Sequence, residues 1–331
     1  MKTILSILLL SSISLTLSAN LKRDAERALE RGAKYFSSIN VQGGYVWFVT
    51  PDLTERWGEG VVDDQTIEVQ SPGTPLVGQT FLRAYNVTQY NPAMRAAKEA
   101  ANALILGQNE LGGWGHTIRF DRAKPRTVSF DDDQTQSAIS FLMAIEHKFA
   151  ADEYSGAVEK ALNLMAVSQL SHGGWPHQYP KQFNYHDYAT FNDEGINDCI
   201  RVMIEADGYY RNSQIRNSLV RAARFLMMSQ LVPPQPGWAQ QYNDYLQPAW
   251  ARSFEPPSVC PQATINNIES LMDLAVHFKN PEYLEPLHDA LAWLDEARLE
   301  SGLWPRFIEI GTGKALYYDR GRIRVNSTEE L

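Results

Sequence analysis

The chain has 331 residues, a formal net charge of −9 and 44% hydrophobic residues, a globular composition sufficient for one large domain or two ordinary ones. The acidic balance excludes a nucleic-acid backbone as the main partner, because the sequence shows no basic patch that would displace counterions.

Residues 1–19 have the three parts of a secretory signal peptide. Lys2 supplies a positive charge, Ile4–Leu17 is mostly apolar, and Ser18-Ala19 are small residues suited to cleavage. The alternative, a membrane anchor, requires about 18 unbroken apolar residues, and serines interrupt this segment. No later segment reaches that length. We therefore predict a secreted or periplasmic protein in which residues 20–331 form a single domain.

A unit of glycine followed by an aromatic residue recurs along the sequence. The five glycines that mark it are 61 to 69 residues apart, a regular spacing that indicates a structural repeat. Helical periodicity begins at Leu21–Ser38, and pairs of helical segments then alternate with the units. The units are Gly43-Gly44-Tyr45, Gly112-Gly113-Trp114, Gly173-Gly174-Trp175, Gly237-Trp238 and Gly302-Leu303-Trp304. The predicted pairs are 74–88 with 92–108, 134–149 with 154–170, 193–210 with 213–231 and 263–279 with 282–299.

Each repeat is therefore a helix, a short turn, a second helix and a glycine–aromatic loop. Strand-like alternation is limited to segments near 45–49, 117–120 and 316–318. Helix pairs of this kind cannot bury their apolar faces alone and must stack. We predict an all-α fold, an α/α toroid that forms an incomplete barrel of helix pairs, with an open solenoid as the alternative. The first helix of each pair then lines the axis, and the loops that enter these inner helices open at one mouth.

The predicted entry loops contain the residues best suited to chemistry. Asp131–Asp133 precede one inner helix, and Asn192-Asp193 precede the next. Both are also acceptable helix N-caps, but three adjacent aspartates repel one another without a cation. Carboxylates with an amide favour a hard cation such as Ca²⁺, whereas Zn²⁺ favours histidine or cysteine. A third entry loop holds Arg252 between aromatic residues, where a structural ion pair with Glu255 is the alternative to a functional role.

Other reactive residues give weaker signals. His172, His177 and His186 share one region without the spacing of a zinc site, and we interpret them as loop histidines. The signatures of nucleotide-binding loops and of serine hydrolases are absent from the sequence. Cys199 and Cys260 form a disulfide or remain buried free thiols, and their spacing does not decide between the two.

Four segments together carry a family resemblance. They are Gly173-Gly174-Trp175-Pro176-His177-Gln178-Tyr179-Pro180, Thr190-Phe191-Asn192-Asp193, Pro248-Ala249-Trp250-Ala251-Arg252-Ser253-Phe254-Glu255-Pro256-Pro257-Ser258 and Trp304-Pro305-Arg306-Phe307-Ile308-Glu309. In order and spacing they resemble the pectic acid lyase family, polysaccharide lyase family 10, over about two-thirds of the chain. The segment around Arg252 is the most specific of the four.

The resemblance implies an α/α toroid that cleaves polygalacturonate by β-elimination with the help of Ca²⁺. It also implies an acidic polysaccharide as the partner, and we expect a monomer. Trp250 stacks on a sugar ring or packs internally, whereas Trp114, Trp175 and Trp238 are expected to pack within the repeats. The site residues that the resemblance implies are Asp131, Asp132 and Asp193 as metal ligands, Arg252 as the base, and Arg306 or Arg320 as the group that binds a substrate carboxylate.

The aspartate segment departs from the family's pattern. The family has Asp-Asn followed by Gly, whereas this chain has Asp131-Asp132-Asp133 followed by Gln134. The additional negative charge strengthens cation binding or reshapes the site.

Two other functions fit the same residues. A glycoside hydrolase on the toroid would use two carboxylates, Asp131 or Asp133 with Asp193, and its products would lack an unsaturated uronate. A non-catalytic protein with this fold would bind the uronan with Ca²⁺ and leave it intact. If the chain is a lyase, Arg252 has to accept a proton although its usual pKa is above about 12, so the rate is expected to rise toward alkaline pH.

Overall fold

The computed structural model describes residues 2–150 and 152–330 of the chain. The described helix pairs are close to those predicted, and the pair with the largest change is the last, where a short 3₁₀ helix at Pro281–Leu284 precedes α9. They are α1 (Lys2–Ser38), α2 (Thr74–Thr88), α3 (Asn91–Gly107), α4 (Gln134–Phe149), α5 (Ser155–Ser168), α6 (Gly195–Tyr210), α7 (Ser213–Ser229), α8 (Pro261–Phe278) and α9 (Leu287–Glu296).

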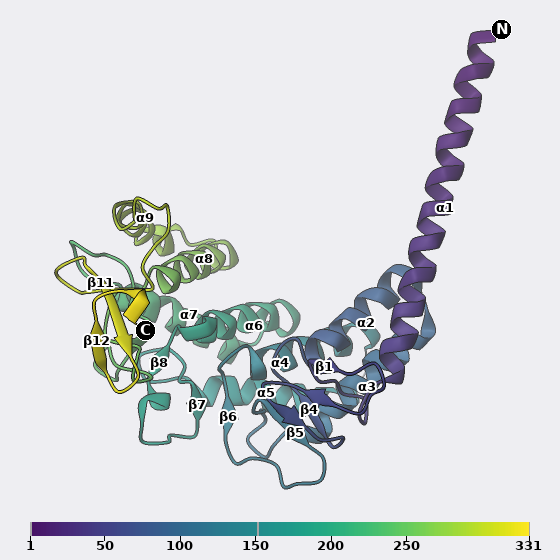
Figure 1. The fold of residues 1–331 in the computed structure, drawn as a ribbon. Helices are drawn as coiled ribbons and strands as arrows, with labels where there is room; N and C mark the ends of the chain where they lie inside the picture. The colour runs from purple at the N-terminus through teal and green to yellow at the C-terminus, as the bar shows by residue number, and fades with distance from the viewer. Residues whose placement is uncertain (1, 151, 331) are drawn as a thin grey trace.

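The helix pairs follow one another along an arc, as expected for the α/α toroid (Figure 1). The first helices of the pairs, α2, α4, α6 and α8, contact one another in succession and form the inner layer. The second helices, α3, α5, α7 and α9, lie outside them, and α1 packs against α2 and α3. The arrangement confirms the predicted inner and outer layers.

Short antiparallel strand pairs close each repeat. A strand that precedes the inner helix pairs with a strand that follows the next glycine–aromatic unit, so one ladder brackets each helix pair. Two or three residues are too few to show alternation in a sequence, which is why most of these strands were not predicted. The pairs are β4 (Thr66–Glu68) with β5 (Thr117–Arg119), β6 (Val128–Ser129) with β7 (Gln178–Tyr179), and β8 (Ala189–Thr190) with β9 (Gln241–Tyr242), and a single bridge joins Val259 to Ile308.

Two small sheets lie at the ends of the arc. The N-terminal sheet consists of β1 (Phe48–Val49), β2 (Arg56–Trp57) and β3 (Val61–Val62). The C-terminal sheet consists of β10 (Phe307–Ile308), β11 (Ala315–Asp319) and β12 (Ile323–Val325). These sheets add residues from outside the helix pairs to the two sides of the mouth.

The tryptophans of the repeat are structural. Trp114, Trp175 and Trp238 are at most 1% exposed, and the indole N–H of each donates a hydrogen bond of 2.8 Å to a carbonyl near the end of the preceding outer helix. The indole of Trp304 makes the equivalent bond to Leu294. Because a buried indole N–H requires a partner, this bond fixes where the chain turns. The expected packing role of the first three tryptophans is confirmed.

Glycine and glutamine complete the same turn. Gly173 has a φ of +106°, and a β-carbon there would lie 2.2 Å from the carbonyl oxygen of Arg221, so only glycine fits. The glutamine at the end of each of α3, α5 and α7 donates to one carbonyl of its own loop and to a second carbonyl within or just before the next outer helix. These bonds are Gln108 to Gly112 and Ala157, Gln169 to Gly173 and Ser218, and Gln230 to Pro236 and Pro286.

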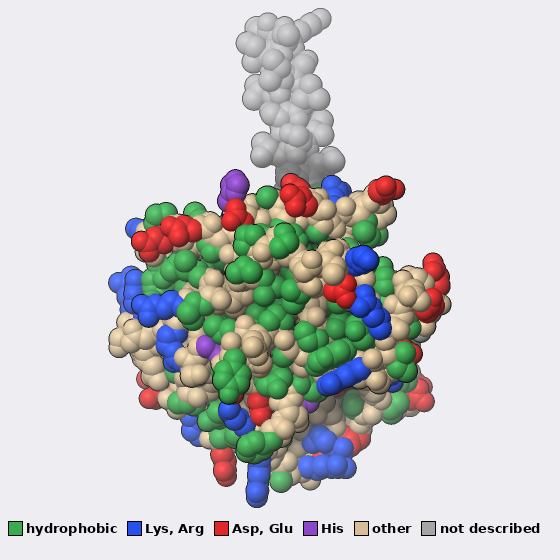
Figure 2. All heavy atoms as spheres, turned by 90° about the vertical axis from the view of Figure 1, so that its left-hand side faces the viewer, with side chains coloured by type: hydrophobic (Ala, Val, Ile, Leu, Met, Phe, Trp, Pro, Cys, Tyr) green, Lys and Arg blue, Asp and Glu red, His purple; other side chains and the backbone are tan. Residues whose placement is uncertain are grey.

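The C-terminal end of the arc exposes apolar side chains. Figure 2 looks onto this end, where they spread over the face with lysines and arginines among them. Val276 on α8 and Leu291 on α9 are more than half exposed, because no further helix pair follows them in the described part of the chain. Exposed apolar side chains at this end are therefore a consequence of the incomplete barrel.

The predicted signal peptide forms the first part of α1, which begins at Lys2 rather than at the predicted Leu21. Residue 1 and the side chains of residues 2–19 lie outside the described part of the structure. Among the described residues, no helix combines the length and the apolar character that a membrane span requires. Cys199 and Cys260 are both buried free thiols, which settles the alternative that the sequence left open.

Candidate active site

The entry loops of α4 and α6 have the same unusual backbone. Asp132 and Asp133 before α4, and Asp193 and Glu194 before α6, all have φ between +45° and +61°. Such conformations are unfavourable for residues other than glycine and are concentrated at functional sites. In neither helix does the side chain of the N-cap residue, Asp133 or Glu194, accept a hydrogen bond from a backbone N–H of the first turn. Asp133 occupies the N-cap position of α4 without a side-chain capping bond, so capping alone does not explain these aspartates.

The structure brings the three predicted metal ligands together. Asp131, Asp132 and Asp193 each contribute a carboxylate oxygen, and these oxygens lie within 4.8 Å of one another. Burial, then the neighbouring Asp131 and Asp193, raises the pKa of Asp132 to about 6, and burial followed by Asp193 also raises the pKa of Asp131. The cluster therefore concentrates negative charge that is only weakly compensated.

His177, which the sequence analysis interprets as a loop histidine, lies beside this cluster. Its Nε2 is 3.0 Å from Oε1 of Gln241, whose Nε2 donates to the carbonyl of Tyr185, so Nε2 of His177 is the donor and Nδ1 carries the lone pair. Burial lowers the pKa of His177 and keeps it neutral. Its Nδ1 faces Oδ1 of Asp131 at 3.9 Å, and that oxygen is buried without a hydrogen-bond partner. Two electron-rich atoms thus face each other.

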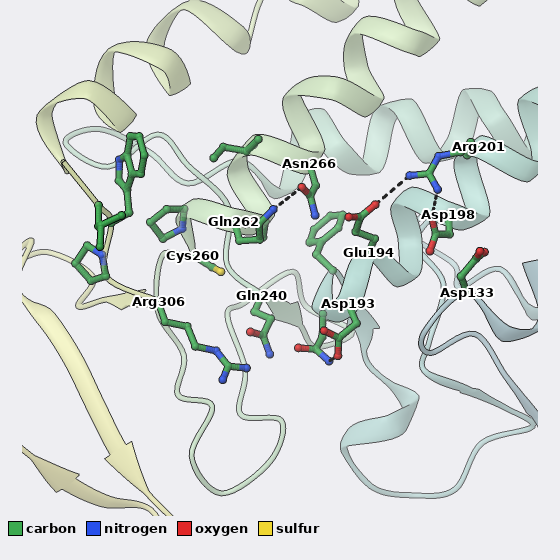
Figure 3. A pocket seen from close by; sticks show the side chains of 18 residues that line it. Asp133, Asp193, Glu194, Asp198, Arg201, Gln240, Cys260, Gln262, Asn266 and Arg306 are labelled. Atoms are coloured by element: carbon green, nitrogen blue, oxygen red, sulfur yellow. Dashed lines mark hydrogen bonds and ion pairs between the residues drawn. The ribbon is translucent and has the colours of Figure 1, made fainter. Parts of the chain in front are cut away.

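The third aspartate of the run points elsewhere. Asp133 lies near Asp198 and Arg201 on α6 (Figure 3), and burial raises the pKa of both carboxyl groups. Arg201 forms ion pairs with Asp198 and Glu194. Relative to the family's pattern, the additional negative charge at the carboxylate cluster of Asp131, Asp132 and Asp193 therefore comes from Asp132 and not from Asp133.

Arg252 is held by one buried carboxylate. The Glu255 side chain is 2% exposed and accepts hydrogen bonds from the backbone N–H, Nε and Nη2 of Arg252 at 3.0, 2.8 and 2.6 Å. Nη2 of Arg306 donates to the same carboxylate at 3.0 Å. The hydrogen bonds with Glu255 raise the pKa of Arg252 above its usual range, and Asp193 and Asp131 raise it further. The ion pair with Glu255 that the sequence offered as an alternative is present, and the negative charges of the carboxylate cluster also act on Arg252.

A cavity of about 1000 Å³ opens between the N-terminal ends of α6 and α8 and residues 303–306. Figure 3 shows Arg306 on one side, Asp193 on the other and Gln240 between them. The volume is at the upper end of the usual range for ligand sites. The cavity therefore joins an arginine to the carboxylate cluster across a space that accommodates a ligand.

A second hollow, of about 740 Å³, is lined in part by residues of the Arg252 loop. Trp250 is half-buried in its wall, and the Arg322 guanidinium lies 4.7 Å from the centroid of the indole ring. Arg320, one of the two predicted carboxylate-binding arginines, is exposed in the β11–β12 turn and lines neither hollow. The sequence analysis did not identify Arg322 as a site residue. It lies near Trp250 in a turn where its φ is +64°, and no sequence pattern predicted that turn.

Comparison with known proteins decides the family. A model of the pectic acid lyase family matches residues 108–302, more than half of the chain. The chain belongs to the pectic acid lyase family. It is therefore a polysaccharide lyase, and the resemblance seen in the sequence is confirmed. The carboxylate cluster and Arg252 lie inside the matched region of this lyase, whereas residues 1–107 and Arg306 lie outside it. Among curated proteins, no sequence matches the chain.

Solved structures show the same fold. A family 10 polysaccharide lyase from Cellvibrio cellulosa is 21% identical, with a TM-score of 0.59 over 68% of this chain and 81% of that chain. A mutant of the same lyase, in complex with trigalacturonic acid, is 20% identical, with a TM-score of 0.60 over 68% and 82% of the two chains. A D-mannose isomerase is 14% identical, with a TM-score of 0.59 over 86% and 73%. These similarities confirm the α/α toroid.

Proposed function

We propose that this polysaccharide lyase is a pectate lyase that is exported and cleaves polygalacturonate by Ca²⁺-assisted β-elimination. The observation that carries the proposal is the position of Arg252 and Arg306, joined through Glu255, beside the cluster of Asp131, Asp132 and Asp193. Trigalacturonic acid in the structure of a mutant of the Cellvibrio lyase supports a uronan as the substrate.

The residues of the cluster fit Ca²⁺. They offer carboxylate oxygens, the donors that this cation prefers, and the buried Oδ1 of Asp131 has no hydrogen-bond partner. Nδ1 of His177, which carries a lone pair, faces that oxygen, and a positive charge nearby would stabilise both atoms. We therefore assign Asp131, Asp132 and Asp193 as the ligands. When bound, Ca²⁺ would neutralise the uronate carboxylate and acidify the adjacent C5 proton.

Arg252 is the proposed base. It takes the C5 proton, the C5–H electron pair forms the C4–C5 double bond, and the C4–O bond breaks as water supplies a proton to the leaving oxygen. In the structure the pKa of Arg252 is raised, first by Glu255 and then by Asp193 and Asp131. Neutralising the two aspartates removes part of that effect, which brings Arg252 closer to the neutral form that a base requires.

Arg306 is the proposed substrate-binding arginine. Its side chain is 57% exposed, lines the large cavity and uses only Nη2 on Glu255, which leaves the other guanidinium nitrogens for a uronate carboxylate. Trp250 is proposed to stack on a sugar ring in the second hollow. Arg320 lies away from both cavities, so the structure favours Arg306 for the role that the sequence left open between them.

The hydrolase alternative fits the geometry less well. Retaining glycosidases place their two carboxyl groups about 5–5.5 Å apart, and inverting enzymes about 6.5–9.5 Å apart. The ligand oxygens of Asp131 and Asp193 lie within 4.8 Å of one another, a separation compatible with the retaining spacing, but both groups face one cluster with Asp132, which suits a shared cation. Binding without cleavage remains an outcome of the test below.

The test incubates purified protein with polygalacturonate, with Ca²⁺ or a chelator, at neutral and alkaline pH. We expect a rise in near-ultraviolet absorbance from the unsaturated product that requires Ca²⁺ and is about 10²–10⁴-fold slower in Arg252→Ala. Arg224→Ala, on an exposed part of the outer helix α7, is the matched control and should retain the wild-type rate. New reducing ends without the absorbance would identify a hydrolase, and binding without either signal would identify a binding protein.

A further inference from the structure

A second group of potential metal ligands lies beside the first. Glu59, His116 and Asp132 each offer one ligand atom, and these atoms lie within 4.8 Å of one another. Glu59 is exposed in the turn between β2 and β3, and His116 directly precedes β5. Asp132 thus belongs to both groups. The N-terminal sheet brings Glu59 to the mouth from a part of the chain that lies outside the family match.

The hydrogen bonds around His116 leave its Nε2 unprotonated and therefore able to bind a metal. Gln70 donates from Nε2 to Oδ2 of Asp132 at 2.9 Å, and its Oε1 lies 2.9 Å from Nδ1 of His116. This orientation of the Gln70 amide makes Nδ1 the protonated nitrogen and leaves the lone pair on Nε2. Metal-binding histidines are typically held in this way, through the N–H of the nitrogen that does not bind.

Gln134 agrees with this tautomer once its amide is turned. As placed, its Nε2 lies 2.8 Å from the same Nδ1 of His116, while its own Oε1 is buried without a partner. Exchanging the two amide atoms puts the oxygen against the Nδ1–H and moves Nε2 to the buried position that has no hydrogen-bond partner as placed. Both buried glutamines then hold His116 with Nε2 as the ligand atom.

A buried carboxyl group provides an independent sign of missing positive charge. Glu68 is 2% exposed and its Oε2 has no hydrogen-bond partner. Its carboxylate lies against Gly58, directly before Glu59, so close that a side chain at Gly58 would overlap it. Burial, then the charge of Glu59, raises the pKa of Glu68 to about 7. An unpaired buried carboxyl group therefore faces the turn that completes the second group.

We propose that Glu59, His116 and Asp132 form a second divalent-cation site, for a cation that accepts nitrogen as well as oxygen, such as Zn²⁺. Two carboxylates and one imidazole suit Zn²⁺, whereas a set of oxygens alone suits Ca²⁺. The two sites share Asp132 as two-metal centres share a bridging carboxylate, and a cation at the second site fastens the β2–β3 turn to the entry loop of α4. The proposal goes beyond the lyase activity and does not depend on it.

The test measures Zn²⁺ binding by titration calorimetry without substrate and with Ca²⁺ in saturating excess. The wild-type protein is expected to bind one Zn²⁺, and Glu59→Gln and His116→Gln are each expected to weaken binding at least ~10-fold. Asp193→Asn should lose Ca²⁺ binding and retain Zn²⁺ binding, which separates the two sites. His288→Gln, at a histidine that is 91% exposed, is the matched control.

Several outcomes would overturn the proposal. These are the absence of Zn²⁺ binding to the wild-type protein and equal affinity in the wild type, Glu59→Gln and His116→Gln. Glu59 lies on an exposed turn, so its variant should fold normally, and circular dichroism checks this. As a second measurement, Co²⁺ bound in place of Zn²⁺ is expected to give a visible absorption spectrum that changes in His116→Gln. Failure to cleave polygalacturonate would leave both readouts intact.

Discussion

Replacing Glu255 by glutamine tests the assignment of Arg252 as the base. The carboxylate of Glu255 holds the proton on Arg252, and hydrogen bonds with it are the first cause of the raised pKa. A base acts in its deprotonated form, so the rate should rise with pH as Arg252 loses its proton. Glu255→Gln removes the negative charge, lowers the pKa of Arg252 and should move this rise to lower pH.

The size of the effect follows from the hydrogen bonds. Nε and Nη2 of Arg252 donate to the two oxygens of Glu255 at 2.8 and 2.6 Å. A hydrogen bond to a charged group contributes about 1.5–3 kcal/mol, and one pKa unit corresponds to about 1.36 kcal/mol. Losing the charge of one such bond therefore predicts a shift of roughly 1–2 pH units. The maximal rate should also fall, because the glutamine amide faces the arginine donors and positions them poorly.

The assay is the pH profile of kcat/KM on polygalacturonate with Ca²⁺, normalised to the highest rate of each variant. Glu309→Gln is the control, since Glu309 pairs with Arg324 at 2.7 Å in the C-terminal sheet, away from the cation cluster. Its profile should match that of the wild type. A profile of folded Glu255→Gln that stays in place, or that moves to higher pH, would refute Arg252 as the base.

Three further predictions concern the cation cluster and the repeat. Ca²⁺ affinity should fall as the pH drops through about 6, where Asp132 takes up its proton, and Asp132→Asn should flatten this dependence in calorimetry. Gly173→Ala should lower the free energy of unfolding, measured by urea denaturation, by more than ~2 kcal/mol, because Gly173 has a positive φ and contacts α7. Gly115→Ala is the control, and its free energy of unfolding should be close to that of the wild type because Gly115 lies in open space. Trp175→Phe removes the indole hydrogen bond to the carbonyl of Met165, which keeps only the 3.4 Å bond from Ser168, and should cost about 0.5–1.5 kcal/mol by the same measurement.

The repeat made most of the fold predictable from the sequence. The glycine–aromatic spacing located the helix pairs within a few residues, because each unit marks a turn whose geometry is set locally by a positive φ and a buried indole. The same spacing placed Asp131–Asp133 and Asn192-Asp193 at the starts of consecutive inner helices. Adjacent inner helices pack side by side, so their entry loops meet.

Residues outside the repeat could not be placed in this way. His177 was interpreted as a loop histidine, yet β6–β7 pairing carries it into the interior beside Asp131. Glu59 lies in a hairpin with no counterpart in other repeats, and Arg322 depends on the turn that follows β11. His177 is placed by long-range pairing between short strands, and Glu59 and Arg322 by local hairpin turns, and neither leaves a periodic signal in the sequence.

The two arginines and the carboxylates would allow this mouth to bind the proposed acidic sugar polymer despite the net negative charge of the chain. Glu255 neutralises part of the charge of Arg252 and Arg306, which keeps both side chains in place without a substrate. Asp131 and Asp193 would repel a uronate unless a cation stands between them and the substrate carboxylate. Uronan binding should therefore require the cation, whereas a neutral sugar would gain nothing from it, so the carboxylate cluster itself selects an acidic polymer.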